Sequence, residues 1–115
     1  MDHTGFHFTP VGGGSALLEP MAGLDIGQAE RLIEEIIRRL QEGKICRLYY
    51  DLSHFPVIDQ GYFTWLNRLA GACKAANTRM ICVNMQPTAA FALASLANLT
   101  PQFETALGLE ESGKN

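Results

Sequence analysis

Residues 25–52 read DIGQAERLIEEIIRRLQEGKICRLYYDL, and two different hydrophobic patterns follow each other in this stretch. Within Ile26–Leu40 the apolar residues recur mainly three or four positions apart, which is the period of one helix face. Gly43 is a favoured residue at the end of a helix. The residues of Ile45–Leu52 are mostly apolar or aromatic without strict alternation, as in a parallel strand covered on both faces. The stretch therefore predicts a helix followed by a buried strand.

Both helices of the central region have a recognisable start. Asp25 is a good N-cap residue, and Gln28 follows three positions later, as in a capping box. Asp59 is expected to cap a long apolar helix from about Gln60 to Ala76. Another strand is predicted at Arg79–Asn84. Helix and strand thus alternate through the middle of the chain.

The two ends of the chain extend this pattern. Alternating residues at 6–11, the triplet Gly12–Gly14 and a short run at 15–18 predict a β-hairpin. After the last predicted strand, Pro87 opens a third helix that is expected to run through Leu96. A short final element is expected around Phe103, Leu107 and Leu109. The order of elements predicts an α/β fold, with a mixed sheet of about four strands after an N-terminal hairpin, packed by helices.

Composition sets the broad class of protein. The chain has 115 residues, so residues 1–115 are expected to form a single domain. Hydrophobic residues make up 47% and charged residues 18%, which excludes a disordered chain. The net charge of −3 argues against nucleic acid as a partner. Without an apolar run of about 18 residues or a secretory signal, we expect a cytoplasmic protein with no direct membrane insertion.

The cysteines support the same compartment. Cys46, Cys73 and Cys82 each lie in an apolar stretch, and their spacing fits no zinc motif. Their odd number is more typical of free thiols than of a disulfide framework. Buried thiols behave as small hydrophobic groups, so a reducing environment is expected.

Residues that would indicate catalysis form no persuasive set. Asp51, Ser53 and His54 stand together at a strand end, but without a nucleophile elbow they are better interpreted as turn residues. His3, His7 and His54 are too dispersed to predict a metal site. The triple glycine lacks the lysine of a phosphate-binding loop. We therefore expect no catalytic residues, no metal and no cofactor, and a protein that is not an enzyme.

The second predicted helix has more apolar surface than one sheet face requires. Two neighbouring stripes run along it, Phe63-Leu66-Ala70-Cys73 and Tyr62-Trp65-Leu69-Ala72. Aromatic residues left near a helix surface are typical of protein interfaces. The alternative is that a third helix covers the second stripe, and the sequence leaves both interpretations open.

The stretch Asp51–Ser53, with Ile58–Gly61 after it, resembles the STAS domain, the module of anti-sigma factor antagonists and of sulfate-transporter tails. The family has a strand ending in Asp-Leu-Ser, a short link, and Asp-Ser-Ser-Gly-Leu at a helix start. Residues 25–32 are similar to its first helix. Residues 80–87 are similar to its next strand and helix start, most of all in the stressosome branch. The resemblance implies the STAS fold from the hairpin to about Glu111.

The resemblance also shows where this chain is atypical. In the family, a partner kinase phosphorylates the first serine after the motif aspartate, and Gln60 matches that serine here. The next serine matches Gly61, and the family's glycine matches Tyr62, where a partner would approach. Asp59 matches the aspartate that shapes the helix start. Because Gln60 has no hydroxyl, phosphorylation at the usual position is not expected.

The leading hypothesis is a non-enzymatic regulatory module that binds its partner constitutively. The expected partner is an anti-sigma factor or a serine-kinase-like regulatory protein, and a homo-oligomer is a further option. A STAS subunit of a lipid or anion transporter and a nucleotide-binding sensor are the alternatives. The predicted partner-binding residues lie in one segment: Phe55, Val57, Asp59, Gln60, Tyr62, Phe63 and Trp65.

Overall fold

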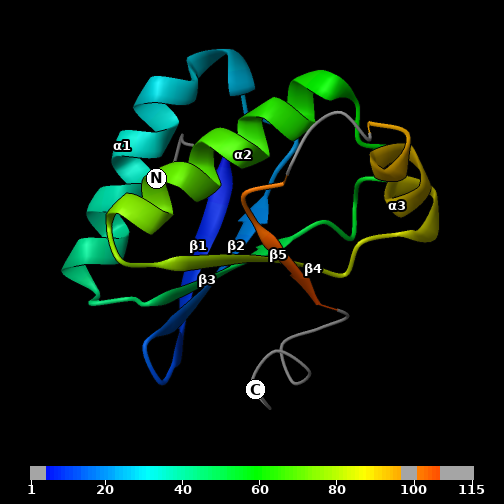
Figure 1. Cartoon of the computed structure of the whole chain (residues 1–115). Helices are drawn as coiled ribbons and strands as arrows, with labels where there is room; N and C mark the ends of the chain where they lie inside the picture. The colour runs from blue at the N-terminus through cyan, green and yellow to red at the C-terminus, as the bar shows by residue number, and fades with distance from the viewer. Residues whose placement is uncertain (1–4, 97–100, 107–115) are drawn as a thin grey trace.

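The chain opens with the β-hairpin that its alternating pattern predicts (Figure 1). The computed structural model describes residues 5–96 and 101–106. In it, strand β1 (Phe6–Gly12) pairs antiparallel with strand β2 (Ser15–Pro20). Gly12–Gly14 have φ angles between +62° and +92°. This left-handed backbone favours glycine, so the triple glycine makes the turn of the hairpin.

Helices and strands then alternate along the chain. They are, in order, η1 (Ile26–Gln28), α1 (Ala29–Glu42), β3 (Arg47–Asp51), α2 (Gln60–Ala75), β4 (Arg79–Val83), α3 (Pro87–Ala94) and β5 (Glu104–Ala106). η1 is a single turn of 3-10 helix that leads directly into α1. The predicted α/β class is confirmed.

The five described strands form one mixed sheet in the order β1-β2-β3-β4-β5. β1 is antiparallel to β2, whereas β2, β3, β4 and β5 run parallel. Helices α1 and α2 lie on one face of this sheet, and α3 lies beyond the carboxyl end of β4 (Figure 1). The carboxyl ends of parallel strands meet at one edge. The loop after β3, the start of α2 and helix α3 are therefore gathered at that edge.

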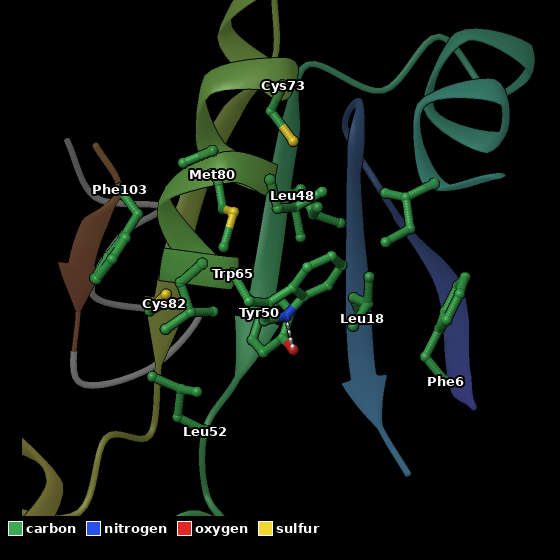
Figure 2. Packing of buried hydrophobic residues seen from close by; sticks show 14 of the residues in the cluster. Phe6, Leu18, Leu48, Tyr50, Leu52, Trp65, Cys73, Met80, Cys82 and Phe103 are labelled. Atoms are coloured by element: carbon green, nitrogen blue, oxygen red, sulfur yellow. Dashed lines mark hydrogen bonds between the residues drawn. The ribbon is translucent and has the colours of Figure 1, made fainter. Parts of the chain in front are cut away.

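The main hydrophobic core lies between the sheet and helices α1 and α2. Its sheet side is formed by Leu18, Leu48, Tyr50, Met80 and Cys82, all at most 3% exposed (Figure 2). Since successive residues of a strand point to opposite faces, every second residue of β3 and β4 belongs to this core. Each fully buried large side chain contributes about 1.5–3 kcal/mol to folding.

A smaller cluster occupies the opposite face of the sheet. It is centred on Tyr49, Ile81 and Val83, which are at most 4% exposed, with Leu17 and Ala106 packed against them. The apolar character of β3 and β4 on both faces thus agrees with the pattern expected for parallel strands.

The first helix starts differently from the sequence prediction and ends at Gly43 as predicted. Asp25 does act as a cap, but it accepts from the backbone N–H of Gly27 at 2.9 Å and starts the 3-10 turn. Gln28 precedes α1 and makes no capping hydrogen bond with its side chain, so the predicted capping box is wrong. At the other end, Gly43 keeps a right-handed backbone, and Lys44 takes the left-handed conformation with φ +53°.

The C-terminal part adds one strand to the sheet. Phe103 is buried, as expected of an apolar residue near the last element, and β5 pairs with β4 directly after it. The other two residues of that prediction, Leu107 and Leu109, lie outside the described residues.

Candidate functional site

The site is built on the loop that joins β3 to α2, residues 52–59, which we call the β3–α2 loop. Its first turn is organised by Asp51, whose carboxylate accepts from the backbone N–H of Ser53 at 2.9 Å and from its hydroxyl at 3.1 Å. Asn84 donates its side-chain amide to the same carboxylate at 3.2 Å. Asp51 and Ser53 are therefore turn residues, which matches the sequence interpretation.

The loop is also tied to the neighbouring strand and to the start of α3. The N–H of Leu52 donates to the carbonyl of Val83 at 2.9 Å. The side-chain amide of Gln86 donates to the carbonyl of Ser53 at 2.6 Å. These bonds join two connections that both leave the carboxyl edge of the sheet, so the β3–α2 loop and the start of α3 are held together at that edge (Figure 1).

The start of α2 has the cap that the sequence predicts. Asp59 has an extended backbone, and its side chain accepts from the N–H of Tyr62 at 2.8 Å. Gln60 is the first helical residue and its side chain is exposed. The hydroxyl of Thr64 donates back to the carbonyl of Gln60 at 2.9 Å. The position that matches the family's phosphorylated serine is thus exposed at the N-terminus of a capped helix.

Tyr62 is half-buried with its hydroxyl pointing into the protein, and its predicted contact with a partner stays a prediction. Its side chain is half-buried, and its hydroxyl is hydrogen-bonded to the hydroxyl of Tyr50 in the core. Its ring packs on Phe55 of the β3–α2 loop, with ring centroids 4.6 Å apart and planes at 30°. Burial raises the pKa of Tyr62 far above its ordinary value. Both phenols therefore stay neutral at physiological pH.

Trp65 and Phe63 are buried, so of the two interpretations that the sequence leaves open the structure supports a covered Trp65. They are 2% and 1% exposed. Figure 2 shows the Trp65 indole reaching toward β3, where its N–H donates to the hydroxyl of Tyr50 at 3.0 Å. Trp65 and Leu69 of the second stripe are covered because α2 lies across the sheet with α1 beside it, whereas Tyr62 and Ala72 are half-buried (Figure 1). Neither side chain contacts a partner without unfolding this part of the core.

The predicted residues that remain accessible are fewer. Val57 is 62% exposed, Asp59 and Gln60 are exposed, and Phe55 is half-buried against Tyr62. Sequence reasoning missed Phe91 of α3, which is 80% exposed at the same edge of the molecule. A signal was present, because residues 84–103 contain no charged side chain.

A groove opens beside the β3–α2 loop. It has a volume of about 450 Å³ and is lined by Pro20, Met21, Ala22, Leu24, His54, Phe55 and Tyr62. The rings of Phe55 and Tyr62 belong to its wall, and its lining is mainly apolar. The β3–α2 loop is thus bordered by an apolar groove and is hydrogen-bonded to Gln86 at the start of α3.

The cysteines and histidines play no part in this arrangement. Cys73 and Cys82 are buried thiols, as predicted, and burial raises the pKa of Cys73 to about 12. Cys46 is exposed, which corrects the expectation that all three thiols are buried. Within residues 5–96 and 101–106, no group of three or more His, Cys, Asp or Glu side chains is placed to hold a metal ion. His3 lies outside this range.

No helix in the described part of the chain has the length and apolar character needed to cross a membrane.

The mixed sheet with α1 and α2 on one face, and the capped helix start after β3, are those of a STAS domain. The family model of the STAS domain matches residues 10–111, and the chain belongs to the STAS domain family. The resemblance drawn from the Asp51–Gly61 region is thereby confirmed. No curated protein sequence shows significant similarity to the chain.

Solved structures agree with this fold. The NMR structure of TM1081 from Thermotoga maritima has a TM-score of 0.77 at 15% identity, covering 100% of this chain and 90% of that protein. A serine-to-glutamate variant of RsbS from Moorella thermoacetica has a TM-score of 0.71 at 16% identity, covering 95% and 92%. The unphosphorylated anti-sigma factor antagonist SpoIIAA, from Bacillus, has a TM-score of 0.62 at 16% identity, covering 95% and 94%.

Proposed function

We propose that the chain is a non-enzymatic regulatory STAS module that binds a protein partner and is not switched by phosphorylation at the start of α2. The proposed partner is an anti-sigma factor or a serine-kinase-like regulatory protein. Gln60 carries the proposal. It is exposed as the first residue of α2, and it bears an amide where the STAS pattern has a phosphorylated serine.

The physical reason is the charge that phosphorylation adds. A phosphoserine carries close to two negative charges and three strong acceptor oxygens, which change a docking surface at a helix start. The amide of Gln60 is neutral at every physiological pH, so this position keeps one charge state. SpoIIAA has been solved in unphosphorylated and phosphorylated forms, which supports phosphorylation as a change that this fold accommodates.

The proposed docking surface has an apolar centre and a polar border. Val57 provides an exposed aliphatic side chain, and Phe91 on α3 provides a second apolar group at the same edge. Asp59 and Gln60 supply the polar border. An apolar centre with polar neighbours is the usual anatomy of a protein interface.

The test is an affinity measurement with a purified anti-sigma serine kinase from the same organism. Gln60→Glu adds a negative charge at the proposed interface, and Val57→Asp adds one at its apolar centre. We expect each variant to bind about tenfold more weakly or worse, which corresponds to about 1.4 kcal/mol.

Gln41→Glu is the matched control, because Gln41 is an exposed glutamine near the opposite end of α1. It should bind like the unmodified chain. Equal affinity for all four proteins, or an equal loss in the Gln41 variant, would overturn the proposed surface.

A further inference from the structure

A chain of hydrogen bonds connects the β3–α2 loop region to the centre of the core. Tyr50 is fully buried on β3, and its hydroxyl accepts from the indole N–H of Trp65 at 3.0 Å. The same hydroxyl is hydrogen-bonded to that of Tyr62, on the first turn of α2. Figure 2 shows Tyr50 and Trp65 meeting beneath α2. The Tyr62 hydroxyl is therefore bonded to a buried hydroxyl, that of Tyr50, which is itself held by β3 and by the indole of Trp65.

The ring of Tyr62 contacts the β3–α2 loop. Phe55 packs on it with ring centroids 4.6 Å apart, and the N–H of Phe55 donates to the carbonyl of Leu52 at 3.1 Å. A tilted aromatic pair of this kind contributes about 0.5–1.5 kcal/mol beyond the area it buries. Tyr62 thus contacts the core with its hydroxyl and the loop with its ring.

We propose that Tyr62 is a positioning residue that fixes the shape of the β3–α2 loop. Its hydroxyl is anchored on Tyr50, its ring holds Phe55, and Phe55 sets the path of the loop toward Val57 and Asp59. A glycine, which the STAS pattern has at this position, offers neither contact. This chain therefore presents a loop that is preformed before any partner arrives.

The consequence for binding rests on the proposed function above. A partner that recognises one loop conformation binds with an apparent Kd equal to its intrinsic Kd divided by the population of that conformation. Loss of the Tyr62 anchor lowers that population without removing a group from the docking surface. Preorganisation of this kind raises affinity by reducing the entropy lost on association.

The direct test is amide hydrogen exchange on the whole chain without any partner. Tyr62→Phe keeps the ring and removes the hydroxyl. We expect the hydrogen-bonded amides of Ser53 and Phe55 to exchange about three- to thirtyfold faster in this variant, because their local opening becomes easier. We also expect the fluorescence of Trp65, the chain's single tryptophan, to change, since its acceptor loses a partner.

Tyr49→Phe is the matched control. It removes the hydroxyl of the tyrosine that precedes Tyr50 in β3. The Tyr49 side chain lies on the other face of the sheet, away from Tyr62. The loop amides of this variant should exchange as in the unmodified chain. The proposal is overturned if Tyr62→Phe leaves the loop amides unchanged, or if the strand amides accelerate by the same factor.

A second variant keeps the proposal testable if Tyr62→Phe does not fold. Phe55→Leu removes the ring contact and preserves the bond between Tyr62 and Tyr50. It should accelerate exchange in the loop while Trp65 fluorescence stays unchanged. Unchanged loop exchange in this variant also overturns the proposal.

A different result would show that the proposed docking surface is wrong while the positioning role of Tyr62 is right. If loop exchange accelerates in Tyr62→Phe but affinity for the anti-sigma serine kinase is unaltered, Tyr62 positions the loop and the partner binds elsewhere. That result supports the positioning role and contradicts the proposed surface.

Discussion

Helices α2 and α3 are both largely apolar, yet they bury their aromatic residues to opposite extents. Trp65 of α2 is 2% exposed, whereas Phe91 of α3 is 80% exposed. α2 lies across the sheet beside α1, while α3 is a short helix beyond the carboxyl end of β4 (Figure 1). Apolar composition therefore does not identify an interface in this fold. The place of the helix relative to the sheet decides which apolar side chains remain for a partner.

The largest expected effect is the difference in stability between alanine variants of these two aromatic residues. Trp65→Ala should destabilise the fold by about 3–5 kcal/mol, because it leaves a cavity and removes the N–H that Tyr50 accepts. Phe91→Ala should change the free energy of unfolding by less than about 0.5 kcal/mol. Urea denaturation of both variants checks the contrast. Similar losses would show that α3 contributes to the core as α2 does.

Alkaline pH should lower the stability of the fold through the buried thiols of Cys73 and Cys82. The pKa of the Cys73 thiol is raised to about 12 by burial, and burial raises that of Cys82 as well. In the unfolded chain a thiol loses its proton from about pH 8.5, so stability is full below this pH and falls as pH rises. Cys73 alone should contribute a loss of about 2 kcal/mol by pH 10.

Thermal unfolding between pH 7 and pH 10 measures this loss. Cys73→Ala should flatten the decline relative to the unmodified chain, whereas Cys46→Ala, at an exposed thiol, should not. A decline of the same steepness in all three proteins would contradict the role of the buried thiols.

The hydroxyl of Tyr50 should have a smaller but measurable effect. Tyr50→Phe leaves the buried N–H of Trp65 without its acceptor, which costs about 1–3 kcal/mol. Tyr49→Phe, on the opposite face of β3, should cost less. Denaturant unfolding of both variants decides the point, and a larger loss for Tyr49→Phe would refute this ranking.

The smallest effect concerns the helix starts. Asp59→Ala removes the side-chain cap of α2 and should cost about 1 kcal/mol. Thr88→Ala, an exposed residue in the first turn of α3, should change stability by less than about 0.5 kcal/mol. Equal changes in melting temperature would show that the Asp59 cap does not stabilise α2.

Local patterns predicted the elements that depend on local physics. The triple glycine marked the hairpin turn, Asp59 marked the start of α2, and Pro87 marked the start of α3. Helical periodicity also identified the buried face of α1. These features depend on turn chemistry, capping and period, all of which act over a few residues.

Features that depend on tertiary placement could not be predicted in the same way. A helical pattern shows which residues share a stripe, but not whether a neighbouring helix covers it, so the sequence leaves open whether Trp65 is exposed or covered. The bond between Tyr62 and Tyr50 joins residues twelve positions apart that meet only when α2 lies on the sheet. The exposure of Phe91 likewise follows from where α3 lies and not from its composition.

The most direct test of the central claim is phosphate transfer from the proposed partner, an anti-sigma serine kinase. The purified chain is mixed with the kinase and ATP, and phosphate incorporation and complex stability are followed by intact-protein mass spectrometry and size exclusion. We predict a complex that persists in ATP, with no phosphate on residues 53–64. Phosphate on Ser53 or Thr64 together with release of the kinase would contradict a module whose docking surface keeps one charge state.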